Sequence, residues 1–363
     1  MSKTKPNKRL YEVAKACIEA SLSDVFSEFD LIGVRSKEGI PYYVTIVSNA
    51  IAAYRGEAGL TGYLALAMLD EESSALEQIE IDLSQEALLA IFTDEQEELE
   101  EEDRKALRAS GVSFTDAVPQ FRLKERYRYP WRLSRSDEED MILIMEALLF
   151  AKEYFASFEK KRQSDSFGPW LDSLGIAEEV GREWLPCVSK EGEGFVITAR
   201  LLIEENFGFV YPQAYFRDEE RQLHFKRLKT KRGKILYYIT GTMVEPVLGQ
   251  RDERPLFPTY AITFDPQTDQ ILDFLMVEDY EKEHAKFVES LLNLFEEHGK
   301  VQAIHCFGRR TLPLLEKIGP QMGIMVVDGG KNELVDELVY SMFDELTHMH
   351  EGGHGPHCDH DHD

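Results

Sequence analysis

Hydrophobic positions along this chain recur with two different periods, and each change of period marks a new element. Between residues 10 and 28, apolar side chains recur at helical spacing, which predicts an amphipathic opening helix. Three short runs rich in β-branched and aromatic residues then predict a small antiparallel meander: DLIGVRS, PYYVTIVS and AIAAYRG. Residues 60–76 again favour a helix. The apolar run at 87–94 is short enough to be a buried strand, although its periodicity also fits a helix.

Two charged stretches follow in the first half of the chain. The acidic run at 95–111 favours a solvated helix that a glycine ends. Residues 121–132 alternate cations with apolar or aromatic side chains, which suits either a contact with single-stranded nucleic acid or a strand whose arginines pair with nearby carboxylates. We favour the second interpretation. A broad apolar helix then begins after Ser134 or Ser136, and the polar run at 160–165 is the predicted domain boundary.

The second half of the chain alternates strands and helices. A region rich in strand signals leads to Lys226–Lys234, whose six basic residues around Gly233 suggest the tip of a hairpin. Residues 260–277 predict a second hairpin around a turn at Asp265. The remaining elements are predicted as helices at 279–297, 311–318 and 331–346 and as strands at 301–307 and 323–327. Strands joined by helices become parallel neighbours, so this half is predicted to be an α/β domain with a mixed sheet.

This order of elements resembles the ribonuclease H-like fold, with ILYYITGTMVEPV as its first strand. Enzymes of that fold hold two metal ions with acids on the first strand, at the end of the fourth strand and on the last helix, because carboxylates must hold the cations that stabilise phosphoryl transfer. Here Glu245 could serve on the first strand, and Glu333 or Asp336 on the last helix. The fourth strand ends in HCFGR without a carboxylate, and Asp328 is an unusual substitute. The resemblance therefore implies the fold without nuclease activity.

The end of that fourth strand carries other candidate groups. His305 and Cys306 could suggest a base and a nucleophile, but adjacent residues on a strand point to opposite faces and cannot pair. Gly308-Arg309-Arg310 lies at a strand-to-helix turn, where an anion could bind, yet no glycine-rich phosphate motif accompanies it. We therefore predict no catalytic and no cofactor-binding residue here.

Four segments carry a resemblance to a known family: YVTIVSNAIAAYRGEAGL, RYPWRLSRSDEEDMILIMEALL, FPTYAITFDPQTDQILDFLMV and the strand at Gly323-Ile324. They resemble an uncharacterised bacterial family that joins two consecutive domains of unknown function. The resemblance supports the division into two domains, which we place at 10–162 (α+β) and 166–346 (α/β) after a flexible start at 1–9. It implies no activity and carries over no functional residue.

Composition narrows the classes of function. A chain of 363 residues is too long for one ordinary core, so two domains are expected. The formal net charge of -26 repels nucleic acid and anionic membranes. No run approaches the roughly 20 apolar residues of a membrane-spanning helix, and the first residues lack the apolar core of a signal peptide. The four cysteines are far apart and form no C-x-x-C pair, so a reducing, cytoplasmic location is predicted.

Residues 347–363 form a tail with a different composition. Six of the ten histidines fall in it, and its glycines and proline predict that it is disordered. Neutral imidazoles at His-x-His spacing, with carboxylates nearby, suit borderline-soft ions such as nickel, zinc, cobalt or copper(II). The predicted metal ligands are His348, His350, His354, His357, Cys358, His360 and His362.

Three functions are open on these observations. The first is a non-enzymatic binding or adaptor protein whose tail binds a divalent transition metal. The second is a metal storage or delivery protein. The third is a nucleic-acid binder or nuclease that uses the two basic stretches and the ribonuclease H-like sheet, which the net charge disfavours. We favour the first, because neither domain has a complete catalytic set.

Overall fold

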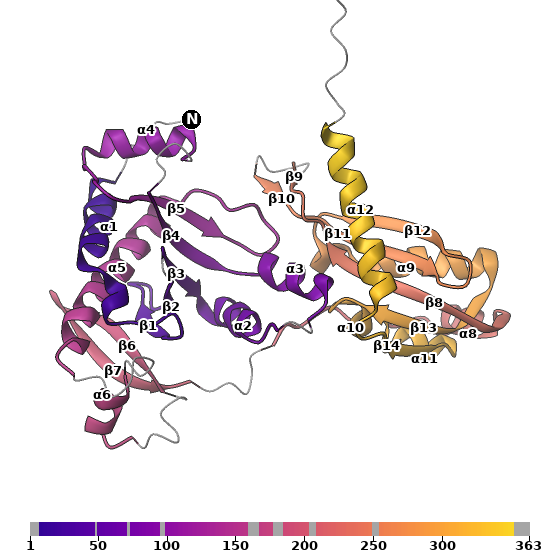
Figure 1. Ribbon diagram of the computed structural model, residues 1–363. Coiled ribbons are helices and arrows are strands. Elements are labelled where there is room, and N and C mark those ends of the chain that lie inside the picture. The colour runs from indigo at the N-terminus through magenta and orange to yellow at the C-terminus, as the bar shows by residue number, and fades with distance from the viewer. Residues whose placement is uncertain are drawn as a thin grey trace, which may run out of the picture. The chain divides into compact units, whose positions relative to one another are not determined.

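The chain folds into two compact units in the computed structural model (Figure 1). The structure describes residues 7–47, 49–70, 73–94, 99–158, 167–176, 184–202, 208–248 and 254–351. Met1–Ala67 and Ser84–Phe209 form the first unit, whereas Met68–Leu83 and Val210–Asp363 form the second. A short segment of the first half of the chain therefore belongs to the second unit.

A seven-stranded mixed sheet organises the first unit, in the order β5-β4-β3-β2-β1-β6-β7. Its strands are β1 (Ile32–Arg35), β2 (Pro41–Val47), β3 (Ala50–Arg55), β4 (Ala87–Thr93), β5 (Val118–Lys124), β6 (Trp184–Glu191) and β7 (Gly194–Leu201). The meander and the strand at 87–94 are confirmed, and β1 to β5 pair antiparallel. β6 pairs parallel to β1, with Gly33 opposite Cys187.

The division between the units differs from the predicted one. The predicted boundary at 160–165 lies outside the described residues, and the second domain was expected to start at 166. Instead β6, β7 and α6 (Gly168–Ser173) belong to the first unit, where Trp170 and Leu171 are buried in its core. Local patterns do not reveal this, because the parallel pairing of β1 with β6 joins residues far apart in sequence.

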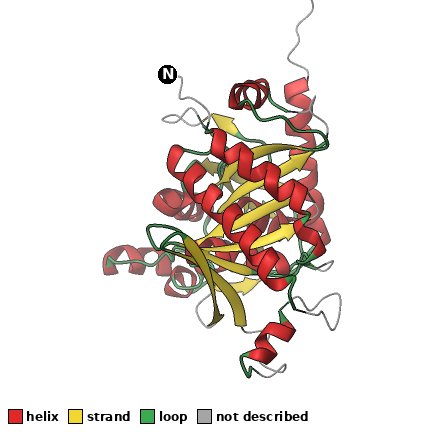
Figure 2. Ribbon diagram, turned by 90° about the vertical axis from the view of Figure 1, so that its left-hand side faces the viewer, coloured by secondary structure: helices red, strands yellow, loops and turns green. Residues whose placement is uncertain are grey.

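Helices cover the faces of this first sheet. On one face lie α1 (Lys8–Ala20) and α5 (Arg135–Phe155), which pack on each other and on the main core (Figure 2). On the other face α2 (Gly56–Ala67) covers β2 and β3 through Leu60, which is fully buried. The helices η1 (Leu22–Asp24) and α4 (Glu101–Ser110) complete the unit, and the predicted acidic helix ends as expected at Gly111.

A five-stranded mixed sheet organises the second unit, in the order β12-β11-β8-β13-β14. Its strands are β8 (Thr230–Thr242), β11 (Thr259–Asp265), β12 (Gln270–Val277), β13 (Lys300–Phe307) and β14 (Met325–Asp328), and β9 (Val247–Leu248) and β10 (Pro255–Leu256) form a separate short pair. β8, β13 and β14 run parallel, whereas β11 is antiparallel to β8 and β12. The predicted hairpin at 260–277 is confirmed.

The predicted hairpin tip at Lys226–Lys234 is wrong. The helix α8 (Glu219–Arg227) ends within this stretch, and β8 then runs straight through Gly233. Gly233 has a positive φ of 74° close to where the register between β8 and β13 shifts, and its N–H donates to Gln302 Oε1 at 2.7 Å. The glycine signals an irregularity inside a strand and not a turn between two strands.

Helices pack on both faces of the second sheet, and their ranges are α3 (Ala75–Leu83), α9 (Tyr280–His298), α10 (Thr311–Leu315), α11 (Ile318–Met322) and α12 (Glu333–Glu351). One core contains α9 and the other contains α12 and α3. α12 continues to Glu351, five residues into the tail that was predicted to start at residue 347. The first helix-breaking residues, Gly352 and Gly353, come after that point.

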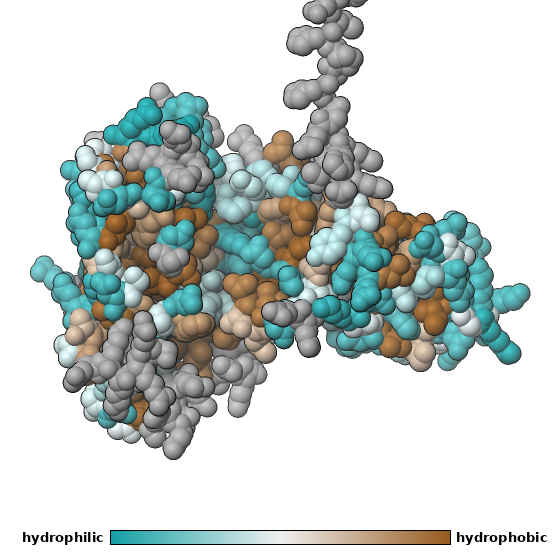
Figure 3. Space-filling view, viewed as in Figure 1, coloured by the Kyte–Doolittle hydropathy of each residue, from teal (hydrophilic) through white to brown (hydrophobic). Residues whose placement is uncertain are grey.

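The edge strand β12 exposes an apolar surface beside α12 (Figure 3). Leu272, Phe274 and Met276 alternate along it and are 39%, 42% and 47% exposed. Phe274 stacks on Tyr260 of β11 with ring centroids 6.2 Å apart, so this surface continues the core on that face.

Candidate functional site

The candidate site lies at the carboxyl ends of the parallel strands β8 and β13. Thr240 and Thr242 come from β8, and Arg310 and Thr311 come from the turn into α10. The hydroxyl oxygens of Thr240 and Thr311 lie 2.7 Å apart. All four side chains are at most 2% exposed, so this edge of the sheet is filled with polar groups.

The guanidinium of Arg310 is the charged centre of this edge. Its Nη1 donates to Thr242 Oγ1 at 3.0 Å, and its Nη2 lies 2.7 Å from Glu80 Oε1. Thr242 Oγ1 in turn donates to Glu80 Oε2 at 2.9 Å. The Tyr280 ring lies under the guanidinium, with its centroid 5.1 Å from Cζ. Arg310, Glu80 and Thr242 therefore form a closed, buried triangle in which the carboxylate neutralises the cation.

Glu80 reaches this edge from α3, which lies in the segment that leaves the first unit. Leu76 of α3 is buried beside Tyr260. Gly241 permits this approach, because a Cβ there would lie 2.3 Å from Tyr260 Oη and 2.8 Å from Leu76 Cδ2. A second ion pair joins Glu77 Oε1 to Arg309 Nη1 at 3.2 Å. α3 is thus held by one buried ion pair, one half-exposed ion pair and an apolar contact.

Burial in this part of the molecule shifts Tyr260 and Cys306 toward their neutral forms. Burial raises the pKa of Tyr260, the Glu80 carboxylate raises it further, and Arg310 opposes both. Burial also raises the pKa of Cys306 to about 12, and Asp328 adds to the shift. The Cys306 thiol is therefore protonated at neutral pH and is not an activated nucleophile.

The acids that the sequence offered as possible metal ligands form no cluster in the described part of the chain. Glu245 lies beyond the end of β8, so its expected place on the first strand is wrong. Glu333 and Asp336 lie in the first turn of α12, and Asp328 accepts from the N–H of Gly330 at 3.0 Å. Among the described residues no three metal-binding side chains form a group. The buried carboxylate of Glu80 at the carboxyl edge pairs with Arg310.

Two predictions about the end of β13 are resolved by these contacts. The ring of His305 stacks on Tyr237, with centroids 5.7 Å apart, and Tyr237 packs against the core that contains α12. Cys306 is buried in the core on the other face of the sheet, which contains α9. The two side chains therefore point to opposite faces and cannot pair. At Gly308-Arg309-Arg310, where the sequence suggested that an anion could bind, Glu80 of the chain itself pairs with Arg310. The anion at this turn is a side-chain carboxylate and not a bound ligand.

The first basic stretch has its own carboxylate partners. Arg122 is 6% exposed and reaches Asp103 Oδ2 at 2.6 Å and Glu100 Oε1 at 3.1 Å. Arg132 pairs with Glu100 and Glu102. The acidic helix α4 therefore neutralises these arginines, as we favoured from the sequence.

The predicted metal ligands of the tail fall into two groups. His348 and His350 lie on α12, whereas the other five, His354, His357, Cys358, His360 and His362, lie outside the described residues. Binding of nickel, zinc, cobalt or copper(II) there stays a prediction.

Sequence reasoning missed Glu80 and Thr242, although one signal was present. The segment ALEQIEIDL places Glu80 four residues after Leu76, which puts the carboxylate on the apolar side of the helix. An acid in that position requires a buried cation as its partner. The sequence does not identify this cation as Arg310, because Arg310 lies far from Glu80 along the chain.

Comparisons with known proteins agree with the two-domain resemblance. Residues 8–167 match a family described as a domain of unknown function (DUF7309), and residues 224–343 match a second one (DUF6930). The chain thus contains two consecutive domains of unknown function. No curated protein and no solved structure matches it. Among the described helices, none is long and apolar enough to cross a membrane.

Proposed function

We propose that this chain is a non-catalytic binding protein whose second domain is a ribonuclease H-like scaffold. The strand order β12-β11-β8-β13-β14, with three parallel strands and an antiparallel hairpin at one edge, supports the fold. The same fold carries many functions, so we infer the non-catalytic role from the residues at the carboxyl edge of the sheet.

The observation that carries the proposal is the buried Arg310–Glu80 pair. Two-metal catalysis needs several carboxylates that hold two cations a few ångströms apart. Here a guanidinium is buried at that edge, and its cationic charge repels a divalent ion. Glu80 is neutralised by that guanidinium and accepts a hydrogen bond from Thr242, so both of its oxygens are engaged.

A cleavage assay tests the proposal. The full chain is incubated with Mg²⁺ or Mn²⁺ and labelled RNA–DNA hybrid or single-stranded DNA, beside the variants Glu245→Gln and Glu333→Gln. We expect no metal-dependent cleavage by any of the three proteins. Exposed Glu297 of α9 provides the matched control Glu297→Gln. Cleavage that persists in this control and disappears in Glu245→Gln or Glu333→Gln would overturn the proposal.

A further inference from the structure

The first unit contains a pocket of about 440 Å³ on the face of its sheet opposite α1 and α5. It lies where β1 and β6 run parallel, and β2 and β7 contribute its outer walls. Its volume falls within the range of about 300–1,000 Å³ that is usual for small-molecule sites. This region is separate from the Arg310 edge of the second unit.

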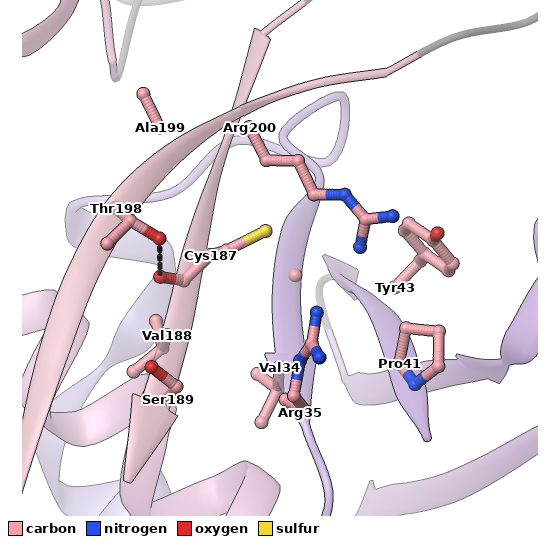
Figure 4. Close-up of a pocket in the computed structure, with 11 residues that line it drawn as sticks. Val34, Arg35, Pro41, Tyr43, Cys187, Val188, Ser189, Thr198, Ala199 and Arg200 are labelled. Atoms are coloured by element: carbon pink, nitrogen blue, oxygen red, sulfur yellow. Dashed lines mark hydrogen bonds between the residues drawn. The ribbon is translucent and has the colours of Figure 1, made fainter. Parts of the chain in front are cut away.

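Two arginines reach the pocket from different strands. Arg35 ends β1 and Arg200 lies near the end of β7, and both side chains extend into the same space with the Cys187 thiol (Figure 4). Tyr43 and Pro41 form the side opposite Cys187 (Figure 4). Within the described parts of the chain, neither arginine forms an ion pair with a carboxylate, in contrast to Arg122, Arg132 and Arg310.

The floor of the pocket depends on a glycine. A Cβ at Gly33 would lie 2.5 Å from Cys187 Sγ and 2.9 Å from Leu185 Cδ1. Gly33 therefore lets the Cys187 side chain lie over β1 and keeps the space between the two arginines open.

The electrostatic effects of both arginines converge on the pocket walls. Burial raises the pKa of Cys187, and Arg200 and Arg35 lower it without reversing the shift. Burial likewise raises the pKa of Tyr43, which Arg200 and Arg35 lower and Glu57 raises. The Cys187 thiol and the Tyr43 hydroxyl are therefore neutral at pH 7, so neither of them compensates the charges of Arg35 and Arg200. An anionic ligand could do so. A protonated thiol also makes this a place for binding and not for nucleophilic attack.

We infer that this pocket binds a phosphate monoester, with the phosphoryl group between Arg35 and Arg200 and the organic part against Tyr43 and Pro41. One guanidinium suffices to bind a carboxylate through two parallel hydrogen bonds, whereas a phosphoryl group with two charges and three oxygens can engage both. The apolar and aromatic wall suits an organic body better than a bare inorganic ion. The inference concerns the first unit and holds whether or not the second unit cleaves nucleic acid.

Calorimetric titration of the full chain tests the ligand class with three probes: phenyl phosphate, inorganic phosphate and benzoate. At about pH 8, where the phosphoryl group carries two charges, we expect phenyl phosphate to bind most tightly. Inorganic phosphate lacks the aromatic contact and benzoate lacks one charge, so both should bind at least about tenfold more weakly.

Variants assign the binding to the two arginines. Arg35→Gln and Arg200→Gln should each weaken phenyl phosphate binding about tenfold or more, and Arg→Lys at either position should recover part of the loss. Arg108 is exposed on α4 outside the pocket, and Arg108→Gln should leave the affinity within about twofold. Glu57→Gln removes a nearby negative charge and should tighten binding. Unchanged thermal unfolding will show that each variant is folded.

Alkylation of Cys187 gives an independent measure of occupancy. Phenyl phosphate should slow the reaction of Cys187 with iodoacetamide, detected by mass spectrometry of the Cys187 peptide. Benzoate binding as tightly as phenyl phosphate would overturn the phosphate assignment. The whole inference fails if phenyl phosphate shows no saturable binding in the millimolar range, if both arginine variants bind it normally, or if Cys187 is not protected.

Discussion

At the scale of single residues, the Arg310–Glu80 pair has the largest expected effect on stability. Glu80→Ala leaves a buried guanidinium without its carboxylate and should lower the free energy of unfolding by about 3–5 kcal/mol. Glu77→Ala removes a half-exposed ion pair from the same helix and should cost less than about 1 kcal/mol. Urea unfolding of both variants measures the difference.

The second test of this pair replaces both charges. Glu80→Leu combined with Arg310→Met removes the cation together with its partner, so the double variant should be more stable than Glu80→Ala alone. A double variant as unstable as Glu80→Ala would show that the shape of the site, and not the unpaired charge, determines the loss.

Gly33 provides a second prediction at this scale. Gly33→Ala places a Cβ against Cys187 Sγ, and we expect a loss of about 1–3 kcal/mol in the free energy of unfolding. In a Cys187→Ala background the loss should be smaller, because the nearest clashing atom is gone. Gly194 of β7 has open space where a Cβ would be, so Gly194→Ala is the matched control, with a change within about 0.5 kcal/mol. Equal losses in both backgrounds would contradict the contact.

The residues of the candidate site could be predicted only in part. Sequence reasoning identified the turn that carries Arg310 and recognised that the strand before it ends without an acid. It predicted no binding residue at that turn and did not identify Glu80 as the partner of Arg310, because Glu80 lies 162 residues before Thr242, and no local pattern links them. The pocket of Arg35 and Arg200 was missed for the same reason, since it forms only when β6 pairs with β1.

At the scale of elements, the start of α5 sets a pH dependence. Burial raises the pKa of Asp137, but hydrogen bonds from Ser134 and Arg55 lower it more, so the folded pKa is below its ordinary value. A lowered folded pKa stabilises the protein above the unfolded pKa of about 3.9, and this contribution is lost as the pH falls through the folded pKa. Asp137→Asn should therefore cost roughly 1 kcal/mol at neutral pH and progressively less in acid.

Unfolding in urea at neutral pH and below about pH 4 checks this prediction. Glu19→Gln alters an exposed pair with Lys15 in α1 and should change stability by less than about 0.5 kcal/mol at either pH. A penalty for Asp137→Asn that stays constant between the two conditions would show that the charge of Asp137 is not the cause.

The end of α12 sharpens the prediction of metal binding by the tail. Calorimetry with nickel or zinc should show binding by the full chain and none by a chain that ends at Leu346. A chain that ends at Glu351 keeps His348 and His350 on a helix. That chain has two of the seven predicted ligands, so it should bind more weakly than the full chain. Equal metal binding by the full chain and by the chain ending at Leu346 would show that the tail is not the metal-binding segment.

Most elements of the second unit could be predicted because each is a long, uninterrupted pattern. The hairpin of β11 and β12 and the helix α9, which begins at the Asp279 cap, needed only local signals. The secondary-structure prediction failed where one residue type is compatible with two kinds of local structure. Gly233 is typical of a turn but here permits an irregularity inside β8, and the β6–β7 hairpin gives no local sign of the sheet it joins.

At the scale of the whole molecule, the two family matches do not coincide with the two units. Residues 68–83 fall within the first match, yet they belong to the second unit and supply its α3. β6 and β7 fall between the matches and complete the first sheet. A second domain that is cut at its family boundaries therefore lacks α3, which belongs to the same compact unit.

This exchange of a segment predicts how the second domain behaves alone. A fragment of residues 208–351 lacks α3, so Arg310 loses its carboxylate and Tyr260 loses the cover of Leu76. We expect it to unfold at a lower urea concentration than the same fragment mixed with a peptide of residues 68–84, and to bind a hydrophobic dye more strongly.

The same peptide with Glu80→Ala separates the two contributions of α3. It keeps Leu76 but cannot neutralise Arg310, so it should restore much less stability than the natural peptide. If the fragment unfolds identically with and without either peptide, α3 does not stabilise the second sheet. If both peptides stabilise it equally, the apolar contact of Leu76 holds α3 in place and the buried ion pair contributes little.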